Sequence, residues 1–242
     1  MHMRENEREA EKGTIIAIDG PAGAGKSTVA QRLARRLGMG YLDTGAMYRA
    51  LTLEALRGRL DLGDGESLAR LAKGMELETR YVKGRRPPFR VFLRGEDVTE
   101  AIRTREVSAH VSQVSSHAAV RAEMVRKQRR LAEGRDMVVE GRDVGTVVFP
   151  SARAKFFITA SVAERAERRH REMRREGHQV SLETVRQEMV RRDRMDATRE
   201  VNPLRRAPDA AVIDTTGLSA SRVVERLLRE VRERLEETAG EG

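Results

Sequence analysis

A short run near the N-terminus combines glycines with a lysine and a serine: Gly20-Pro21-Ala22-Gly23-Ala24-Gly25-Lys26-Ser27. It matches the pattern G-x-x-x-x-G-K-S/T, in which the backbone N–H groups of a glycine-rich loop surround phosphate oxygens. In such loops the lysine reaches the β- and γ-phosphates and the hydroxyl ligates Mg²⁺. We therefore predict that Gly20 to Thr28 bind ATP and that Ser27, the nucleotide phosphates and water hold Mg²⁺. A purely structural loop is the alternative.

Asp43, Thr44 and Arg49 suit a second substrate that carries a phosphate group. Asp43 and Thr44 can cap a helix, and Arg49 would lie about 6 Å along that helix from Gly45. A cap hydroxyl and a helical arginine beside a phosphate loop can bind a second phosphate. Simple capping with an exposed arginine would explain the same residues.

The segment Glu140-Gly141-Arg142-Asp143 follows an apolar run at 137–139. Side chains just after a strand of an α/β sheet face the edge where ligands bind. Arg142 can contact a phosphate or a base, and Asp143 can accept hydrogen bonds from the amino group of a base. Turn formation alone is the alternative explanation for Gly141 and Asp143.

Apolar runs and helical repeats indicate the elements that position these segments. Compact apolar runs, typical of strands buried on both faces, occupy residues 14–19, 137–139, 156–158 and 211–213. Helical patterns occupy residues 26–37, 45–57, 120–133, 162–176 and 182–192, and a last helix has Val223, Leu227, Val231 and Leu235 in one stripe. This alternation predicts an α/β fold.

Two regions depart from that alternation. Residues 75–98 alternate apolar with polar side chains around a turn-rich stretch at 83–88, which predicts an antiparallel insertion. From Arg165 to Arg199 nearly every helical turn carries arginines and little apolar surface. We expect this second region to be a mobile, solvent-facing arm.

Composition limits the classes of function. The 242 residues give a formal charge of +9, and 39% of them are hydrophobic, which describes a folded protein that attracts phosphates or polyanions. The absence of cysteine excludes disulfides and thiolate chemistry. Residues 1–12 form a charged run that predicts a disordered tail rather than a signal peptide, and we expect a cytoplasmic protein.

Several segments together resemble the bacterial cytidylate kinase family. They are the glycine loop, Leu42-Asp43-Thr44-Gly45-Ala46-Met47-Tyr48-Arg49, Gly95-Glu96-Asp97-Val98 with Ile102-Arg103, Ser112-Gln113-Val114, and the run from Gly141-Arg142-Asp143 to Pro150. The resemblance extends from about Gly13 to Leu235. It implies transfer of the γ-phosphoryl group of ATP to CMP or dCMP. We expect a monomer that binds neither nucleic acid nor membrane.

The resemblance also implies the residues of the site and the domains. Lys26, Arg142 and Arg192 would be catalytic, and the CMP-binding residues would be Thr44, Arg49, Ser112, Arg121, Arg142, Asp143, Arg192 and Asp196. The fold would be a P-loop core with a parallel five-stranded sheet flanked by helices, at residues 13–73, 113–164 and 200–242. A nucleotide-binding region at 44–112 would hold the small antiparallel β insertion at about 74–112. The arm at 165–199 would be a helical lid that closes over the phosphates through Arg165, Arg168, Arg169, Arg191 and Arg192, with Arg199 nearby.

The sequence departs from the family pattern at the lid and after the strand at 137–139. Met195 and Ala197 stand where relatives often carry lid arginines, and Glu140 stands where aspartate is common. Other functions stay open on the residues alone: a nucleic-acid-binding NTPase, a P-loop kinase of UMP, AMP or shikimate, or a scaffold. The arm lacks aromatic residues for base stacking, which disfavours nucleic acid. A scaffold would leave Lys26, Arg49 and Arg142 unexplained.

Overall fold

The computed structural model describes residues 13–85, 87–175 and 177–239, so the predicted tail at 1–12 lies outside the described residues. The chain divides into two compact units. Unit 1 comprises Met1–Gly40 with Gly134–Gly242, and unit 2 is Tyr41–Glu133. None of the described helices is long and apolar enough to cross a membrane.

A five-stranded sheet has the strand order β2-β6-β1-β7-β8. The central strand β1 pairs in parallel with β6 and β7, and β7 pairs in parallel with β8. These strands are β1 Ile15–Asp19, β2 Gly40–Asp43, β6 Met137–Gly141, β7 Ala154–Thr159 and β8 Ala211–Asp214. Every residue of β1 and β6 is buried, which explains why both read as continuous apolar runs. The predicted parallel five-stranded sheet is confirmed.

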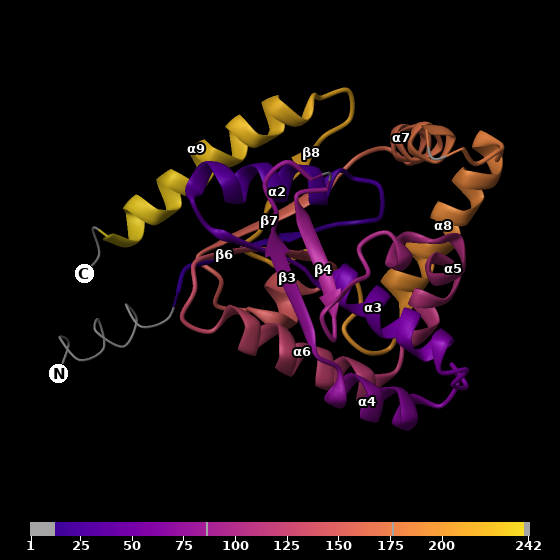
Figure 1. Ribbon diagram of the computed structural model, residues 1–242. Helices are drawn as coiled ribbons and strands as arrows, with labels where there is room; N and C mark the ends of the chain where they lie inside the picture. The colour runs from indigo at the N-terminus through magenta and orange to yellow at the C-terminus, as the bar shows by residue number, and fades with distance from the viewer. Residues whose placement is uncertain (1–12, 86, 176, 240–242) are drawn as a thin grey trace. The chain divides into compact units, whose positions relative to one another are not determined.

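The helices of unit 1 cover this sheet and extend beyond it. They are α2 Lys26–Leu37, α7 Val162–Arg175, α8 Leu182–Thr198 and α9 Ala220–Ala239. Helix α9 packs along α2 (Figure 1). In the predicted stripe of α9, Val223, Leu227 and Val231 are buried. A π-helical turn, Val144–Val148, follows β6.

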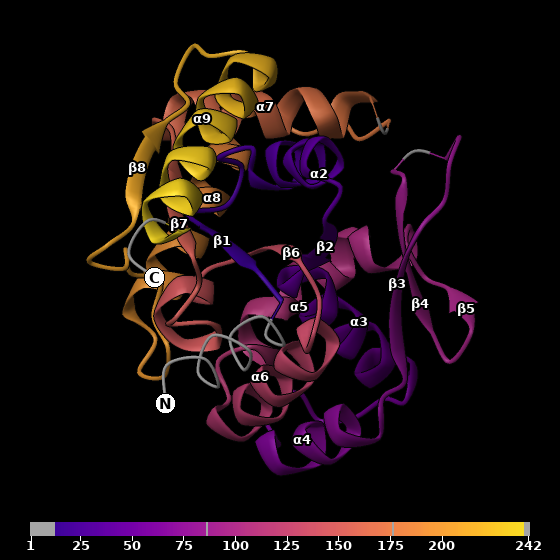
Figure 2. The same cartoon turned by 90° about the vertical axis from the view of Figure 1, so that its left-hand side faces the viewer.

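Unit 2 contains helices and a small antiparallel sheet. The helices are α3 Thr44–Arg57, α4 Gly65–Gly74, α5 Arg105–Val114, α6 Ala118–Ala132 and the 3₁₀ turn Ala101–Arg103. The strands β3 Leu77–Tyr81, β4 Phe89–Leu93 and β5 Glu96–Asp97 pair in sequence order (Figure 2). The predicted antiparallel insertion is confirmed in β3 and β4, on either side of the predicted turn.

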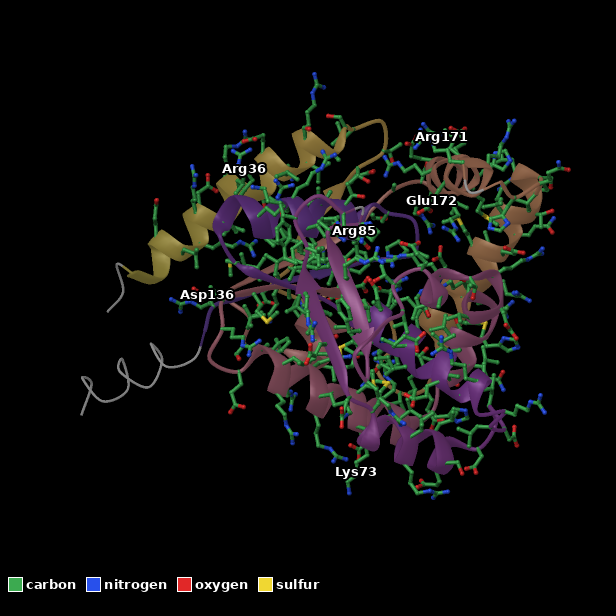
Figure 3. The ribbon with its side chains drawn as sticks, in the orientation of Figure 1. Arg36, Lys73, Arg85, Asp136, Arg171 and Glu172 are labelled. Carbon is green, nitrogen blue, oxygen red and sulfur yellow. The ribbon has the colours of Figure 1, made fainter. Side chains whose placement is uncertain are left out.

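The expectation of a solvent-facing arm at 165–199 is wrong in part. Ala166, Met173, Val185 and Met189 form a hydrophobic cluster between α7 and α8, and Val180 packs against it. Arg165 is buried, and Arg171, labelled in Figure 3, lies on the same helix with an exposed side chain. Four apolar side chains at helical spacing were enough to give the two helices a shared core, although arginines surround them in the sequence.

Candidate active site

The phosphate loop connects β1 to α2 through glycines whose backbone requires their small size. Gly20, Gly23 and Gly25 have φ values of 147°, 73° and 88°. A Cβ atom on Gly20 would lie 1.9 Å from the carbonyl oxygen of Ile158, a distance that no side chain tolerates. Gly25 is the N-cap of α2, so the free N–H groups of that helix begin directly after the loop. This arrangement is a ready site for phosphate.

Lys26 is buried at the start of α2 and bonds its own loop. Its Nζ donates to the carbonyl oxygen of Pro21 at 2.8 Å. Burial and the charge of Arg142 lower the pKa of Lys26 to about 7, while Glu140 and Asp19 act in the opposite direction. The ammonium ion is therefore poorly stabilised by the protein alone, and an anion beside it would favour the charged form.

Arg142, Arg192 and Asp196 form a charged cluster whose field reaches Lys26. Arg142 Nε donates to Asp196 Oδ2 at 2.9 Å, and Asp196 is 6% exposed. Burial acts to raise the pKa of Asp196, but Arg142 and Arg192 hold it below its usual value. Burial and the neighbouring Arg142 lower the pKa of Arg192. Arg142 and Arg192 repel each other, so a phosphorylated ligand would stabilise these two cations.

Asp143 is buried beside another arginine. Its Oδ1 lies 3.7 Å from Arg199 Nη2, and Arg199 Nε donates to the carbonyl oxygen of Asn202 at 2.6 Å. Asn202 has a φ of 52°, a left-handed conformation that asparagine adopts more readily than most residues. The turn after α8 therefore fixes Arg199 next to Asp143.

Thr44, Arg49 and Ser112 lie in unit 2. Asp43 is the N-cap of α3 and accepts a hydrogen bond from Ala46 N at 2.9 Å, as predicted, and Thr44 begins the helix with a buried side chain. Arg49 is half-buried rather than exposed, and its Nη1 donates to Ile102 O and to Ser108 Oγ at 3.1 and 2.8 Å. Ser112 is half-buried on α5. Ile102 O and Ser108 thus hold Arg49 in place. No motif in the sequence indicates a role for Ser108.

Arg121 is the most deeply buried arginine of unit 2 among the described residues, at 1% exposure. Its guanidinium carbon lies 5.3 Å from the centre of the Tyr48 ring, and its Nη1 donates to Ser115 O at 3.1 Å. Burying a guanidinium costs free energy unless it is paired, and the Tyr48 ring and Ser115 O offset part of that cost.

The arginines of α7 contact the phosphate loop and its surroundings. Arg165 Nη1 donates to Ala22 O at 3.0 Å and pairs with Asp193 of α8 at 2.6 Å. Arg168 donates to the hydroxyl and carbonyl oxygens of Thr215. The single proton of that hydroxyl has two acceptors within reach, Thr159 O at 3.0 Å and Ala24 O of the loop at 3.2 Å. Residues distant in sequence thus contact the carbonyl oxygens of Ala22 and Ala24.

One buried carboxylate of this region is absent from the residues that the sequence selects. Asp19, the last residue of β1, accepts hydrogen bonds from Val144 N and Gly145 N, each at 2.8 Å. Burial raises its pKa to about 6 even though these two bonds oppose the shift. The signal was present in the sequence, because a charge that ends a buried strand directly before a phosphate loop requires an explanation.

A parallel sheet, a phosphate loop at the end of its central strand and a basic cluster around the loop lysine define a P-loop phosphotransferase. The family model for cytidylate kinase matches residues 16–233. The chain belongs to the cytidylate kinase family. It is accordingly an enzyme of the nucleoside monophosphate kinase class, with CMP or dCMP as the acceptor, which confirms the resemblance seen in the sequence.

Relatives with this name cover nearly the whole chain. The cytidylate kinase of Bacillus subtilis (strain 168) is 49% identical over 224 residues, which is 93% of this chain and 99% of the relative. That of Geobacillus kaustophilus (strain HTA426) is 51% identical over 220 residues, or 91% and 97%. A solved structure of an uncharacterized protein from Eubacterium ventriosum has a TM-score of 0.50 at 14% identity, covering 90% of this chain and 98% of that one. It shows a shared fold only.

Proposed function

We propose that this protein transfers the γ-phosphoryl group of ATP to CMP or dCMP, giving ADP and CDP or dCDP, through the residues described above. The observation that carries the proposal is the group of mutually repelling cations at the phosphate loop: Lys26, Arg142 and Arg192. Asp196 and Glu140 compensate the charge of Arg142 and raise its pKa, but the pKa values of Lys26 and Arg192 stay lowered. The phosphates of two substrates would stabilise the charged forms of Lys26 and Arg192.

Positioning and charge stabilisation provide nearly all of the catalysis in phosphoryl transfer. Lys26 would bind the β- and γ-phosphates once ATP draws its Nζ from Pro21 O. Arg142 and Arg192 would stabilise the charge on the oxygens of the transferring group. Asp196 would hold Arg142 in this orientation, since it already accepts a hydrogen bond from Arg142 Nε.

The proposed roles in CMP binding follow the chemistry of each side chain. Arg142 and Asp143 would contact the base and the phosphate, with Arg192 and Asp196 at the phosphate and ribose. Arg49 would bind phosphate, and Ser112 would read the base. The proposed set is Thr44, Arg49, Ser112, Arg121, Arg142, Asp143, Arg192 and Asp196.

Ser27 suits the Mg²⁺ that the ATP chemistry implies. Its side chain is exposed in the first turn of α2, directly after Lys26. The hydroxyl oxygen is a hard ligand, and the remaining ligands would be nucleotide phosphates and water, as Mg²⁺ prefers. When bound, the ion would neutralise charge on the β- and γ-phosphates. We also propose that the enzyme works in the cytoplasm as a monomer.

The test is ADP release from ATP and Mg²⁺ with CMP, dCMP, UMP, AMP or no acceptor, for the wild-type protein and for Asp143→Ala. We expect strong release with CMP and dCMP and little with the other acceptors. Asp143→Ala should lose most of the CMP activity while still binding ATP. ADP release that does not depend on any nucleoside monophosphate would refute the proposal, and a salt-dependent gel shift would then test nucleic acid as the partner.

A further inference from the structure

Asp19 joins the phosphate loop to the segment that follows β6. It is the residue before Gly20, and in the β1–β6 register it lies opposite Gly141. Its Oδ1 accepts from Val144 N and its Oδ2 from Gly145 N, each at 2.8 Å. One carboxylate, 4% exposed, thus binds two successive N–H groups of the neighbouring segment.

The bonds to Asp19 fall directly after Arg142 and Asp143. Beyond them, the carbonyl oxygen of Asp143 accepts from Val147 N and Val148 N at 2.9 and 3.2 Å. The peptide groups on the C-terminal side of Asp143 are therefore fixed by the carboxylate at one point and by the π-helical turn at the next. Asp143 itself has φ and ψ of −143° and 23°, outside regular helix and strand. Regular secondary structure therefore does not set the direction of its side chain, which depends on the hydrogen bonds of the flanking backbone.

The spacing at Gly145 shows how closely the two segments are fitted. A Cβ atom added there would lie 3.4 Å from Asp19 Oδ2 and 3.2 Å from Lys155 Cδ. The second contact is tighter than ordinary packing, so Lys155 would have to move. Lys155 is restrained, since its Nζ donates to Pro150 O at 2.6 Å and pairs with Asp209 at 2.8 Å.

We propose that Asp19 is a positioning residue for CMP: by capping Val144 and Gly145 it sets the orientation of Arg142 and Asp143 relative to the phosphate loop. This inference rests on the proposed role of Arg142 and Asp143 in CMP binding. Asp19 does not need to touch either substrate. Loss of the cap would release the acceptor-binding residues while the glycine loop and Lys26 remained.

The electrostatics agree with a functional rather than a stabilising role. Burial raises the pKa of Asp19 to about 6, the two backbone hydrogen bonds lower it, Asp143 raises it and Lys26 lowers it. A carboxylate whose charge is disfavoured by its surroundings adds little to stability. Retention of a charge in this place is understandable if its two acceptor oxygens are needed for the geometry.

The test compares Asp19→Asn with Asp136→Asn. An asparagine at 19 keeps one acceptor oxygen and turns an NH₂ group toward the other backbone N–H. Asp136, labelled in Figure 3, is a matched control because it accepts a hydrogen bond from Thr14 N at 2.6 Å, at the opposite ends of the same two strands. Both variants lose a carboxylate that connects β6 with β1.

For Asp19→Asn we expect the KM for CMP to rise about 10- to 100-fold, as for loss of a buried hydrogen bond, and the preference for CMP over UMP to fall. The KM for ATP should rise several-fold less than the KM for CMP, because Asp19 affects ATP only through its charge near Lys26. Asp136→Asn should leave both substrate constants unchanged. An unchanged KM for CMP in Asp19→Asn, or an equal rise in both constants, would overturn the inference.

A second variant covers the case in which Asp19→Asn does not fold. Gly145→Ala keeps the carboxylate and disturbs the same junction from the other side, so its KM for CMP should also rise with a smaller change for ATP. An unchanged KM for CMP in Gly145→Ala would then overturn the inference. The activity of the wild-type protein with CMP distinguishes failure of the Asp19 inference from failure of the proposed function. If the wild type had no such activity, the proposed function itself would be refuted.

Discussion

Arg165 of α7 donates a hydrogen bond to the carbonyl oxygen of Ala22 in the phosphate loop, across 3.0 Å. The same guanidinium donates to Ala160 O and pairs with Asp193. A carbonyl oxygen held from outside the loop leaves the neighbouring N–H groups free for phosphate. Arg165 therefore contacts the loop through its backbone, a role separate from any contact between a lid arginine and the phosphates.

The first prediction follows from that contact. Arg165→Ala should raise the KM for ATP about tenfold, because the carbonyl oxygen of Ala22 loses the donor that fixes it. The variant should also be about 3 kcal/mol less stable, as when other buried ion pairs lose one partner. Arg171→Ala is the control, since Arg171 is exposed on the same helix. Steady-state kinetics and urea unfolding measure both effects. Equal behaviour of the two variants would show that burial of Arg165 has no special role.

The second prediction concerns the pH dependence of stability at Asp19. Its pKa is raised from 3.8 to about 6 in the folded protein, so the folded state binds the proton more tightly than the unfolded state. This group therefore destabilises the fold above pH 6, and the cost is relieved as the pH falls toward 4. Asp19→Asn lacks this dependence.

The free energy of unfolding of the wild type should consequently improve relative to that of Asp19→Asn by about 1 kcal/mol between pH 8 and pH 5. Urea unfolding of both proteins at the two pH values measures the difference, in which contributions from other titrating groups cancel. A difference that is constant with pH would mean that Asp19 has an ordinary pKa.

Much of the fold can be predicted, because most strands are continuous apolar runs and most helices repeat apolar residues every three or four positions. The predicted helix at 26–37 matches α2, and apolar runs mark β1, β6, β7 and β8. The prediction of a strand buried on both faces fails for β8, an edge strand in which only Ile213 is buried. Strand β2 was not predicted as such, because Tyr41 and Leu42 are its only buried residues and so short a run has no period. Helices α4 and α5 were also not predicted. Each is ten residues long and has only three buried residues, too few for a clear helical repeat of apolar side chains.

The site is harder to predict where a residue acts through the backbone. Lys26, Arg142 and Asp143 stand in motifs, so their types and spacing indicate the chemistry. Asp19 and Arg165 bond to backbone N–H and carbonyl groups. Nearly every residue carries these groups, so the sequence does not indicate which residues are the partners. Helix α8 also runs six residues beyond the predicted end at 192 and so includes Asp196, which pairs with Arg142.

The third prediction tests Arg121 within unit 2. Arg121→Met should raise the KM for CMP at least tenfold, because the guanidinium proposed to bind CMP is lost, and should leave the KM for ATP nearly unchanged. The free energy of unfolding should fall by about 1 to 3 kcal/mol, because the carbonyl oxygen of Ser115 loses its donor. Arg126→Met on the same helix is the control, with an exposed side chain paired to Glu123. Similar KM values for CMP in the wild type and Arg121→Met would remove Arg121 from the proposed site.

The last prediction compares two ion pairs of equal length and different exposure. Arg142 Nε and Asp196 Oδ2 are 2.9 Å apart, with side chains 19% and 8% exposed. Arg36, labelled in Figure 3, lies 2.9 Å from Glu225 with side chains 56% and 54% exposed. Double-mutant cycles with alanine should give a coupling free energy of about 1 to 3 kcal/mol for the first pair and less than about 0.5 kcal/mol for the second.

The two cycles should also respond differently to salt and to substrate. Exposed charges are screened, so the small Arg36–Glu225 coupling should vanish near 1 M salt while that of Arg142–Asp196 persists. Asp196→Ala should in addition raise the KM for CMP, because Arg142 loses the acceptor that orients it, whereas Glu225→Ala should have no kinetic effect. If the Arg142–Asp196 coupling were as small as that of the exposed pair, Asp196 would not hold Arg142, and any loss of CMP binding in Asp196→Ala would have to come from direct contact with the substrate.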